Sequence, residues 1–341
     1  MGQEEEAKAM RVLIPYRDVL GRDVTSPITS GGIERFVRHL IHELDDASAV
    51  DVTKLYYGDS EAMKELVATT VRERSIDLVI CNYPHRCLNT SLSKSIPNIP
   101  IIWVNHHTAG LHPQAEDIAA RMERHVREDG RLWMVSEKQA DDWIEFGHRF
   151  GHEVRYHGII PPSMVRSDFR HSGEVRWDVV TVGRCDEVKN PFLAHVVSRR
   201  ARLRSLVMCG FAAGEYCLKN QDWTGWQVTG WNYTDNRVSS ELSRSGVFLV
   251  TWPDETFGIA ALEALAHGLP LVLYAPSGSH VCEALLPGSP WIIKATSIEE
   301  LEPAIRRMSE IVPKERMMLS TAARSLHGAK KWREKLKEMI G

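Results

Sequence analysis

The sequence has no long apolar run and no N-terminal signal segment. Its longest apolar stretches, such as 177–182 and 269–276, have only the length of a strand, whereas a membrane-spanning helix needs about 20 apolar residues. The first ten residues, MGQEEEAKAM, are charged and contain no apolar core that would direct secretion. We therefore expect a cytoplasmic protein without stable membrane insertion, and a flexible leader over residues 1–10.

Cysteine is scarce and its spacing carries no metal-binding pattern. Six cysteines occur in 341 residues, and none forms a C-x-x-C pair or joins histidines at zinc-like spacing. This spacing argues against a zinc-binding domain and indicates free thiols in a reducing compartment.

Neither sign of charge is in excess. The chain has 42 Lys and Arg against 45 Asp and Glu, a net charge of −3. Residues 1–160 contain 19 basic and 25 acidic side chains, and residues 161–341 contain 23 and 20. This balance argues against a protein that coats nucleic acid, and it makes the second half the better place for an anionic ligand.

Two common catalytic loops are also missing. The sequence contains neither the phosphate-binding motif G-x-x-x-x-G-K-[ST] nor the nucleophile motif G-x-S-x-G. Their absence argues against P-loop kinases and against esterases.

Strand-like and helix-like patterns alternate along the whole chain. In the predicted helix at 31–46, for example, the apolar positions recur with a period near 3.6. We expect strands at 11–16, 50–57, 77–83, 99–107, 131–137, 154–159, 177–183, 204–210, 226–231, 246–252, 269–274 and 290–295. Apolar strands alternating with helices are typical of parallel sheets covered on both faces.

A polar, proline-led segment at 161–175 interrupts this alternation and reads as a linker. The sequence therefore predicts an α/β protein with two doubly wound domains and a cleft between them. We expect the first domain at 11–160 and the second at 176–315.

The stretch TWPDETFGIAALEALAHGLP (251–270) places two carboxylates, Glu255 and Glu263, around the start of a short apolar helix. Ligands of open α/β sheets bind beyond the carboxyl ends of the strands, and strand 246–252 ends here. A helix that begins near Gly258 would direct free backbone N–H groups toward a phosphate. A carboxylate among Ile, Ala and Leu is costly without a partner, so we interpret the pair as ligand-binding groups.

The pattern E-T-F-G-x-x-x-x-E-A-x-A-x-G-x-P resembles the signature of retaining glycosyltransferases with the GT-B fold, a group that includes glycogen synthases and many bacterial mannosyl- and glucosyltransferases. The resemblance implies two Rossmann-like domains with an interdomain cleft, and a C-terminal helix, 316–341, that crosses back to the first domain. It also implies transfer of a hexose from a nucleotide diphosphate sugar to a hydroxyl.

The same resemblance assigns roles to the motif. Glu255 would hold hydroxyls of the donor sugar, and Glu263 would bind the ribose hydroxyls. Backbone N–H groups at 257–259 would meet the diphosphate or the sugar. The implied donor-binding residues of this stretch are Glu255, Thr256, Phe257, Gly258, Ile259 and Glu263.

A second segment, VGRCDEVKNP (182–191), resembles the loop in which this family clamps the donor diphosphate, here with Arg184 and Lys189. Cations at this place would stabilise the negative charge that a departing nucleoside diphosphate gains. They would act in place of a metal, and the chain has no D-x-D at a strand end. We therefore expect no metal and no cofactor.

Three further segments match the family in order. Gly31 and Gly32 precede a helix, where the backbone can approach a phosphate closely. His107 matches a family histidine near the transferred sugar, with His106 as the alternative. Trp231 or Tyr233 would cover the face of a uracil, so a UDP-sugar, UDP-glucose first, is the expected donor.

The acceptor is less defined. The order of motifs resembles phage enzymes that glucosylate hydroxymethylated DNA bases, which would place the protein in a host cytoplasm. Arg121 and Arg124 would then contact DNA phosphates, although the first domain is acidic and arginines at this spacing also fit a solvated helix face. The most specific expectation is a 5-hydroxymethylpyrimidine base of duplex DNA. The alternative is a bacterial glycan, a lipid or a small molecule.

Two other classes of protein stay open at this point. The same fold serves nucleotide-sugar epimerases and non-catalytic sugar-nucleotide binders. The presence of the whole donor set in one chain favours a transferase.

Overall fold

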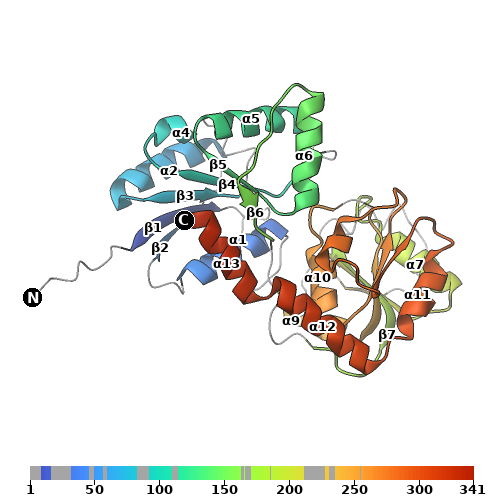
Figure 1. The fold of residues 1–341 in the computed structure, drawn as a ribbon. Coiled ribbons are helices and arrows are strands. Elements are labelled where there is room, and N and C mark those ends of the chain that lie inside the picture. Colours follow the sequence, from blue (N-terminus) through green and yellow to red (C-terminus); the bar gives the residue numbers. More distant parts are fainter. Residues whose placement is uncertain are drawn as a thin grey trace, which may run out of the picture. The chain divides into compact units, whose positions relative to one another are not determined.

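The computed structural model describes residues 9–16, 32–45, 50–56, 60–82, 92–109, 114–162, 165, 170–184, 186–210, 227–229, 235–253 and 255–341. They form two compact units. Unit 1 comprises the described residues between 9 and 162 together with Trp332–Gly341, and unit 2 comprises those between 165 and 331 (Figure 1). No helix in the described part of the chain is both long and apolar enough to cross a membrane.

Unit 1 is built on a six-stranded sheet in the order β2-β1-β3-β4-β5-β6, in which all pairs are parallel. The strands are β1 (Met10–Tyr16), β2 (Val50–Tyr56), β3 (Leu78–Cys81), β4 (Ile101–Asn105), β5 (Arg131–Met134) and β6 (Gly158–Ile159). β3 and β4 are buried along their whole length. β6 is shorter than the strand predicted at 154–159, because it pairs only with Trp133 and Met134 at the end of β5.

The helices of unit 1 pack against this sheet or against one another. They are α1 (Gly32–Asp45), α2 (Ser60–Arg74), α4 (Leu92–Ser95), α5 (Ala115–Arg127), α6 (Glu137–Arg149) and the larger part of α13 (Ala329–Ile340). In α13, Trp332 packs edge-on against Phe36 of α1 at a centroid distance of 6.2 Å. Its indole N–H donates to the carbonyl of Pro161 at 2.9 Å. Residues 332–340 therefore complete the core of unit 1.

Unit 2 is built on a second six-stranded parallel sheet, in the order β12-β11-β10-β7-β8-β9. The strands are β7 (Trp177–Arg184), β8 (Ser205–Gly210), β9 (Gln227–Thr229), β10 (Ser245–Val250), β11 (Leu271–Tyr274) and β12 (Ile292–Ala295). If β7 is numbered as the first strand, the order is 3-2-1-4-5-6, as in a Rossmann sheet. Successive strands are added on one side of β7 up to β9 and on the other side from β10 onward, so the strand order reverses between β7 and β10. The helices are α7 (Pro191–Arg200), α9 (Asp235–Leu242), α10 (Ile259–Ala266), the short 3₁₀ helix η1 (Val281–Leu285), α11 (Leu301–Ser309) and α12 (Pro313–His327).

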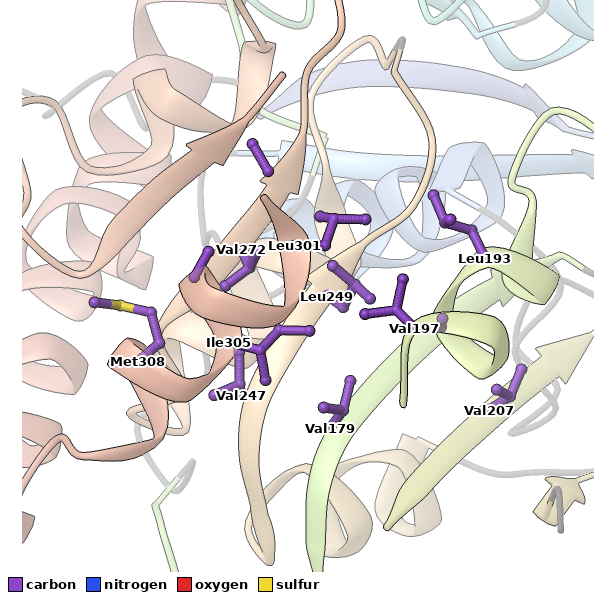
Figure 2. Packing of buried hydrophobic residues seen from close by; sticks show 13 residues of the cluster. Val179, Leu193, Val197, Val207, Val247, Leu249, Val272, Leu301, Ile305 and Met308 are labelled. Atoms are coloured by element: carbon purple, nitrogen blue, oxygen red, sulfur yellow. The ribbon is translucent and has the colours of Figure 1, made fainter. Parts of the chain in front are cut away.

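The core of unit 2 lies between its sheet and two helices on one face (Figure 2). Val179, Val247 and Val272 from three neighbouring strands are not exposed at all. They pack with residues of α7 and α11, of which Val197 and Ile305 are labelled examples. This packing fixes the strand ends from which the loops of the site start.

The prediction of an α/β protein with two doubly wound sheets is confirmed. The helix predicted to begin near Gly258 begins at Ile259, with Gly258 as its N-cap at φ +91°. The C-terminal helical region is divided into α11, α12 and α13, and Gly328 separates the last two. The sequence pattern missed α4 and η1, which are too short to show a period.

Candidate functional site

The sheet of unit 2 has its topological switch point between β7 and β10, which are hydrogen-bonded neighbours. Ligands of doubly wound sheets bind at such a point, beyond the carboxyl ends of the strands. Lys189 lies on the loop that follows β7, and Glu255 lies on the loop that follows β10. The fold therefore brings two segments that are 66 positions apart to one edge of the sheet.

The Lys189 loop is fixed by its own backbone. The Lys189 N–H donates to Asp186 Oδ1 at 2.9 Å, and its carbonyl accepts from Thr251 Oγ1 at 2.6 Å. Thr251 comes directly after β10, so this bond ties the first loop to the second strand. Asn190, at φ +40°, then turns the chain into α7 with Pro191 at the first helical position.

Three side chains meet at the switch point. The Lys189 ammonium lies 2.5 Å from Glu255 Oε2 and 4.4 Å from the centre of the Trp252 ring. The side chains of Lys189 and Glu255 are 16% and 19% exposed, and Trp252 is 2% exposed. The ammonium is thus held between a carboxylate and an aromatic face in a largely dry place, where such contacts are stronger than at an open surface.

Glu255 is ionised in this environment. Burial alone would raise the pKa of its carboxyl group, but the charge of Lys189, its hydrogen bond and the Thr256 N–H outweigh burial, so the pKa lies below its ordinary value. The Thr256 N–H donates to Glu255 Oε1 at 2.9 Å. An ionised carboxylate can only accept hydrogen bonds, which suits a group that holds hydroxyls.

α10 begins at Ile259, four positions after Glu255. No side chain in the described part of the chain caps this helix, and its first-turn N–H groups have no intrahelical acceptor. A Cβ atom at Gly258 would lie 2.5 Å from Cys282 Sγ. Glycine is therefore required here both by the positive φ and by the close approach of Cys282.

His280 is a member of the site that the sequence did not indicate. Its Nε2 lies 3.0 Å from the Trp252 carbonyl, and its Nδ1 accepts from the Cys282 N–H at 3.1 Å. The two bonds fix the neutral form with the proton on Nε2, and burial lowers the pKa of His280. No motif surrounds this residue in the sequence, so only the fold shows that it supports the backbone of Trp252.

Glu263 lies in the middle of α10, the helix whose start faces the switch point. The residue is partly buried, and its Oε2 atom is fully so. The described contacts do not join it to Glu255.

The predicted histidines lie in unit 1, after the carboxyl end of β4. The His107 carbonyl accepts from Gln139 Nε2 and Trp143 Nε1, both at 2.8 Å, and its N–H donates to Asn105 Oδ1 at 3.1 Å. α6 therefore holds this short loop in place. His106 packs edge-on against Phe36 at 4.9 Å, and burial, with a smaller contribution from His107, lowers its pKa to about 3.

Arg121 and Arg124 lie on α5 of unit 1. Arg121 forms an ion pair with Asp117 one turn earlier, so its charge is partly neutralised. Arg124 is exposed.

Four of the residues predicted for the site lie wholly or partly outside the described part of the structure. Gly31, Trp231 and Tyr233 lie outside the described residues, as does the side chain of Arg184. Arg184 ends β7, and Gly32 is the first residue of α1. Among the residues that the structure describes, no group of three His, Cys, Asp or Glu side chains is placed to hold a metal ion.

Residues 168–326 match the family model of the glycosyl transferases group 1. No curated protein sequence matches the chain.

Among solved structures, the chain is similar to the sucrose-phosphate synthase tll1590 from Thermosynechococcus elongatus, with a TM-score of 0.76 and 13% identity over 97% of this chain and 98% of that one. It is similar to Alr3699/HepE of Anabaena, solved with UDP and glucose, with a TM-score of 0.71 and 14% identity over 97% and 99%. For AviGT4, a glycosyltransferase of avilamycin A biosynthesis, the TM-score is 0.66 with 16% identity over 97% of both chains. At these identities the likeness shows a shared fold.

Proposed function

We propose a donor and a reaction for this chain. The chain is a glycosyltransferase of the GT-B fold, and its residues 168–326 match the glycosyl transferases group 1. It transfers a hexosyl group from a UDP-sugar, UDP-glucose first, to a hydroxyl with retention of configuration. The observation that carries this proposal is the contact between Lys189 and Glu255 at the switch point of unit 2.

The two charges suit the two ends of a sugar diphosphate. Glu255, ionised and already accepting from Thr256, receives hydrogen bonds from hydroxyls of the donor sugar. Lys189, together with Arg184, binds the diphosphate. Backbone N–H groups at Phe257, Gly258 and Ile259 add the positive end of the α10 dipole.

The proposed reaction is the one that the family resemblance implies. The bond between the anomeric carbon and the diphosphate oxygen breaks, and the leaving group gains negative charge that Lys189 and Arg184 stabilise. The acceptor oxygen bonds to the anomeric carbon on the same face, and its proton passes to the departing phosphate. The side chains of the site orient the donor, and none of them forms a covalent intermediate.

The other donor contacts are proposals of the same kind. Glu263 binds the ribose hydroxyls, since hydroxyl groups can donate to a carboxylate on this helix. Trp231 covers the base, Gly31 and Gly32 admit the phosphates, and His107 contacts the sugar. UDP is preferred because structurally similar proteins were solved with it: HepE with UDP and glucose, and the pneumococcal transferase GtfA with UDP and GlcNAc.

The acceptor is a hydroxyl of one of two classes. Arg121 and Arg124 of α5 are the cations proposed to contact hydroxymethylated duplex DNA. The ion pair of Arg121 with Asp117 weakens the support for DNA. A glycan, lipid or small-molecule hydroxyl is therefore tested beside it, and DNA binding without salt dependence would count against the DNA acceptor.

The experiment is a thermal-shift panel of UDP-, GDP- and ADP-sugars, followed by mass spectrometry of products formed from each acceptor class. A donor at a hundred times its dissociation constant stabilises the protein by about 2.7 kcal/mol. We expect stabilisation by a UDP-sugar and loss of this stabilisation in Lys189→Ala. Lys138→Ala, which removes one partner of a half-exposed ion pair on α6, should have no effect. Product formation should persist in EDTA. Epimerised or hydrolysed UDP-sugar without any transfer product would instead identify an epimerase or hydrolase, and no response to any nucleotide sugar would refute the proposal.

A further inference from the structure

Unit 1 contains a second candidate site, a cavity of about 50 Å³ between α4 and α5. One water needs roughly 10–15 Å³, so the cavity has room for several waters or one small ion. α4 and α5 lie side by side over the sheet (Figure 1). Ser93 Oγ on α4 donates to Glu128 Oε2, just after α5, at 3.0 Å and joins the two helices.

This cavity is not part of the histidine loop. α5 runs from the carboxyl end of β4 back toward the amino end of β5, so Arg124 in its last turn lies toward the amino edge of the sheet. Ile101, the first residue of β4, also lines the cavity. His106 and His107 follow the opposite, carboxyl end of β4.

The charged lining is positive. Lys94, Arg121 and Arg124 border the cavity against one carboxylate, that of Glu128. Asp117 faces Arg121 from outside the cavity. In the described part of the chain no ion pair involves Lys94 or Arg124, and both are exposed at the entrance.

The inner wall offers a neutral donor. Trp103 lines the cavity and is 1% exposed, and its Nε1 atom is buried without a hydrogen-bond acceptor among the described residues. A buried N–H without an acceptor is unfavourable. His125 stands perpendicular to this ring at 5.6 Å. Because burial lowers its pKa to about 4, it adds no charge at neutral pH.

We propose that this cavity binds a small oxyanion, a phosphate or carboxylate group, in contact with Arg121, Arg124 and the indole N–H of Trp103. Guanidinium groups form strong charge-assisted hydrogen bonds with such groups. The oxyanion would also provide the acceptor that the indole lacks. Lys94 at the entrance would attract it. The site is independent of the donor site proposed in unit 2, and it is an alternative to the DNA contacts proposed above for the same two arginines.

The test uses the full chain carrying Lys189→Ala, which weakens phosphate binding at the proposed donor site, and every further variant is compared in this background. Inorganic phosphate, glucose 1-phosphate and acetate are titrated at constant ionic strength, with the unfolding temperature as the readout. We expect saturable stabilisation, and at least about tenfold weaker binding in Arg124→Gln and in Trp103→Phe, which keeps an aromatic ring but removes the N–H. Tighter binding of glucose 1-phosphate than of inorganic phosphate would indicate a phosphate ester as the ligand rather than free phosphate. Tighter binding of acetate than of both would indicate a carboxylate ligand.

The matched control is Arg127→Gln. Arg127 lies one turn from Arg124, pairs with Glu123 at 2.7 Å and does not line the cavity. Its variant should bind like the parent. No saturable response to the three anions, or unchanged binding in Arg124→Gln, would overturn the proposal. The exposed Arg124 keeps the test valid if Trp103→Phe fails to fold. Loss of donor binding in unit 2 would leave the result unchanged.

Discussion

The Lys189 ammonium lies 2.5 Å from the Glu255 carboxylate, and each residue stands just beyond one of the two strands where the sheet of unit 2 reverses its order. Neither charge would be favourable there alone, because both side chains are largely withdrawn from water. The proposed donor site is based on this pair, with a negative group of the donor at Lys189 and hydroxyls at Glu255.

The coupling of this pair can be measured by a double-mutant cycle. Lys189→Met should lower the free energy of unfolding by about 1–2 kcal/mol, since it leaves a partly buried carboxylate without its cation. Adding Glu255→Gln should restore part of the loss. Lys138→Met, in the half-exposed pair with Asp142, should change stability by less than about 1 kcal/mol. Strictly additive effects of the two substitutions in urea unfolding would show that the pair is not coupled.

Glu255→Gln tests the role of the charge in the reaction. The amide has the same shape, but it is a weaker acceptor for sugar hydroxyls. We expect kcat/KM to fall by about a hundredfold, the range seen when one preorganised hydrogen-bonding group is removed. Steady-state kinetics with the preferred UDP-sugar gives the value, and circular dichroism controls for folding. A variant with full transferase activity would exclude Glu255 from the donor site.

Trp252 should matter through the face of its ring. Trp252→Leu removes the contact with Lys189. A cation–π contact contributes about 0.5–2 kcal/mol, which corresponds to a loss of roughly 2–30-fold in donor affinity. Trp252→Phe keeps an aromatic face and should lose less. Calorimetric titration with UDP, well below the unfolding temperature of each variant, makes the comparison. Equal affinities of the Leu and Phe variants would contradict a role for the ring.

A comparison of Gly258 with Gly278 separates backbone strain from a steric clash. Both have positive φ, +91° and +80°, but a Cβ at Gly278 would meet nothing within 4 Å, whereas one at Gly258 would lie 2.5 Å from Cys282 Sγ. Gly278→Ala should cost about 1 kcal/mol, and Gly258→Ala about 2–4 kcal/mol. In a Cys282→Ala background the cost of Gly258→Ala should shrink. The free energies of unfolding of the four variants are measured in urea. Equal losses of stability at the two glycines would contradict the steric argument.

Acid should destabilise unit 1 through two buried histidines. The pKa is lowered to about 3 for His106 and to about 4 for His125. Because the unfolded chain takes up these protons near pH 6.5 and the folded chain does not, stability falls as the pH drops below that value. At pH 5 each histidine should cost about 2 kcal/mol relative to pH 7.

His125→Gln should reduce this pH dependence by removing one titrating group. His148→Gln, at an exposed position of α6, should leave it unchanged. The measurement is the unfolding free energy in urea at pH 7 and pH 5. A His125 variant with the same pH dependence as the parent would refute the assignment.

The sequence predicted the parts of the site that are local in the chain. The apolar strand at 246–252, Gly258 and the helix after it follow from patterns within twenty residues, and Glu255 was identified from its place among them. His280 could not be found in this way. Its role depends on the turn before η1 reaching the Trp252 carbonyl 28 positions away, which only packing decides.

The position of the Trp252 ring and the cavity of unit 1 also could not be predicted from the sequence. Trp252 belongs to the stretch TWPDETFGIAALEALAHGLP, but a sequence pattern gives distances along the chain and does not show which ring covers an ammonium group. The cavity beside α5 depends on α4, a four-residue helix too short to produce a period. The roles of Arg184, Gly31 and Trp231 stay predictions.

The core of unit 1 has a consequence for synthesis. Most of unit 2 is one uninterrupted stretch of the sequence, 164–331. Unit 1 instead combines residues from both ends of the sequence, because Trp332 packs on Phe36. At roughly 5–20 residues per second, the ribosome adds Trp332 about 10–30 s after residue 162. The unit that is synthesised first is therefore the one completed last, and until then its apolar surface around Phe36 is a place where chaperones can bind.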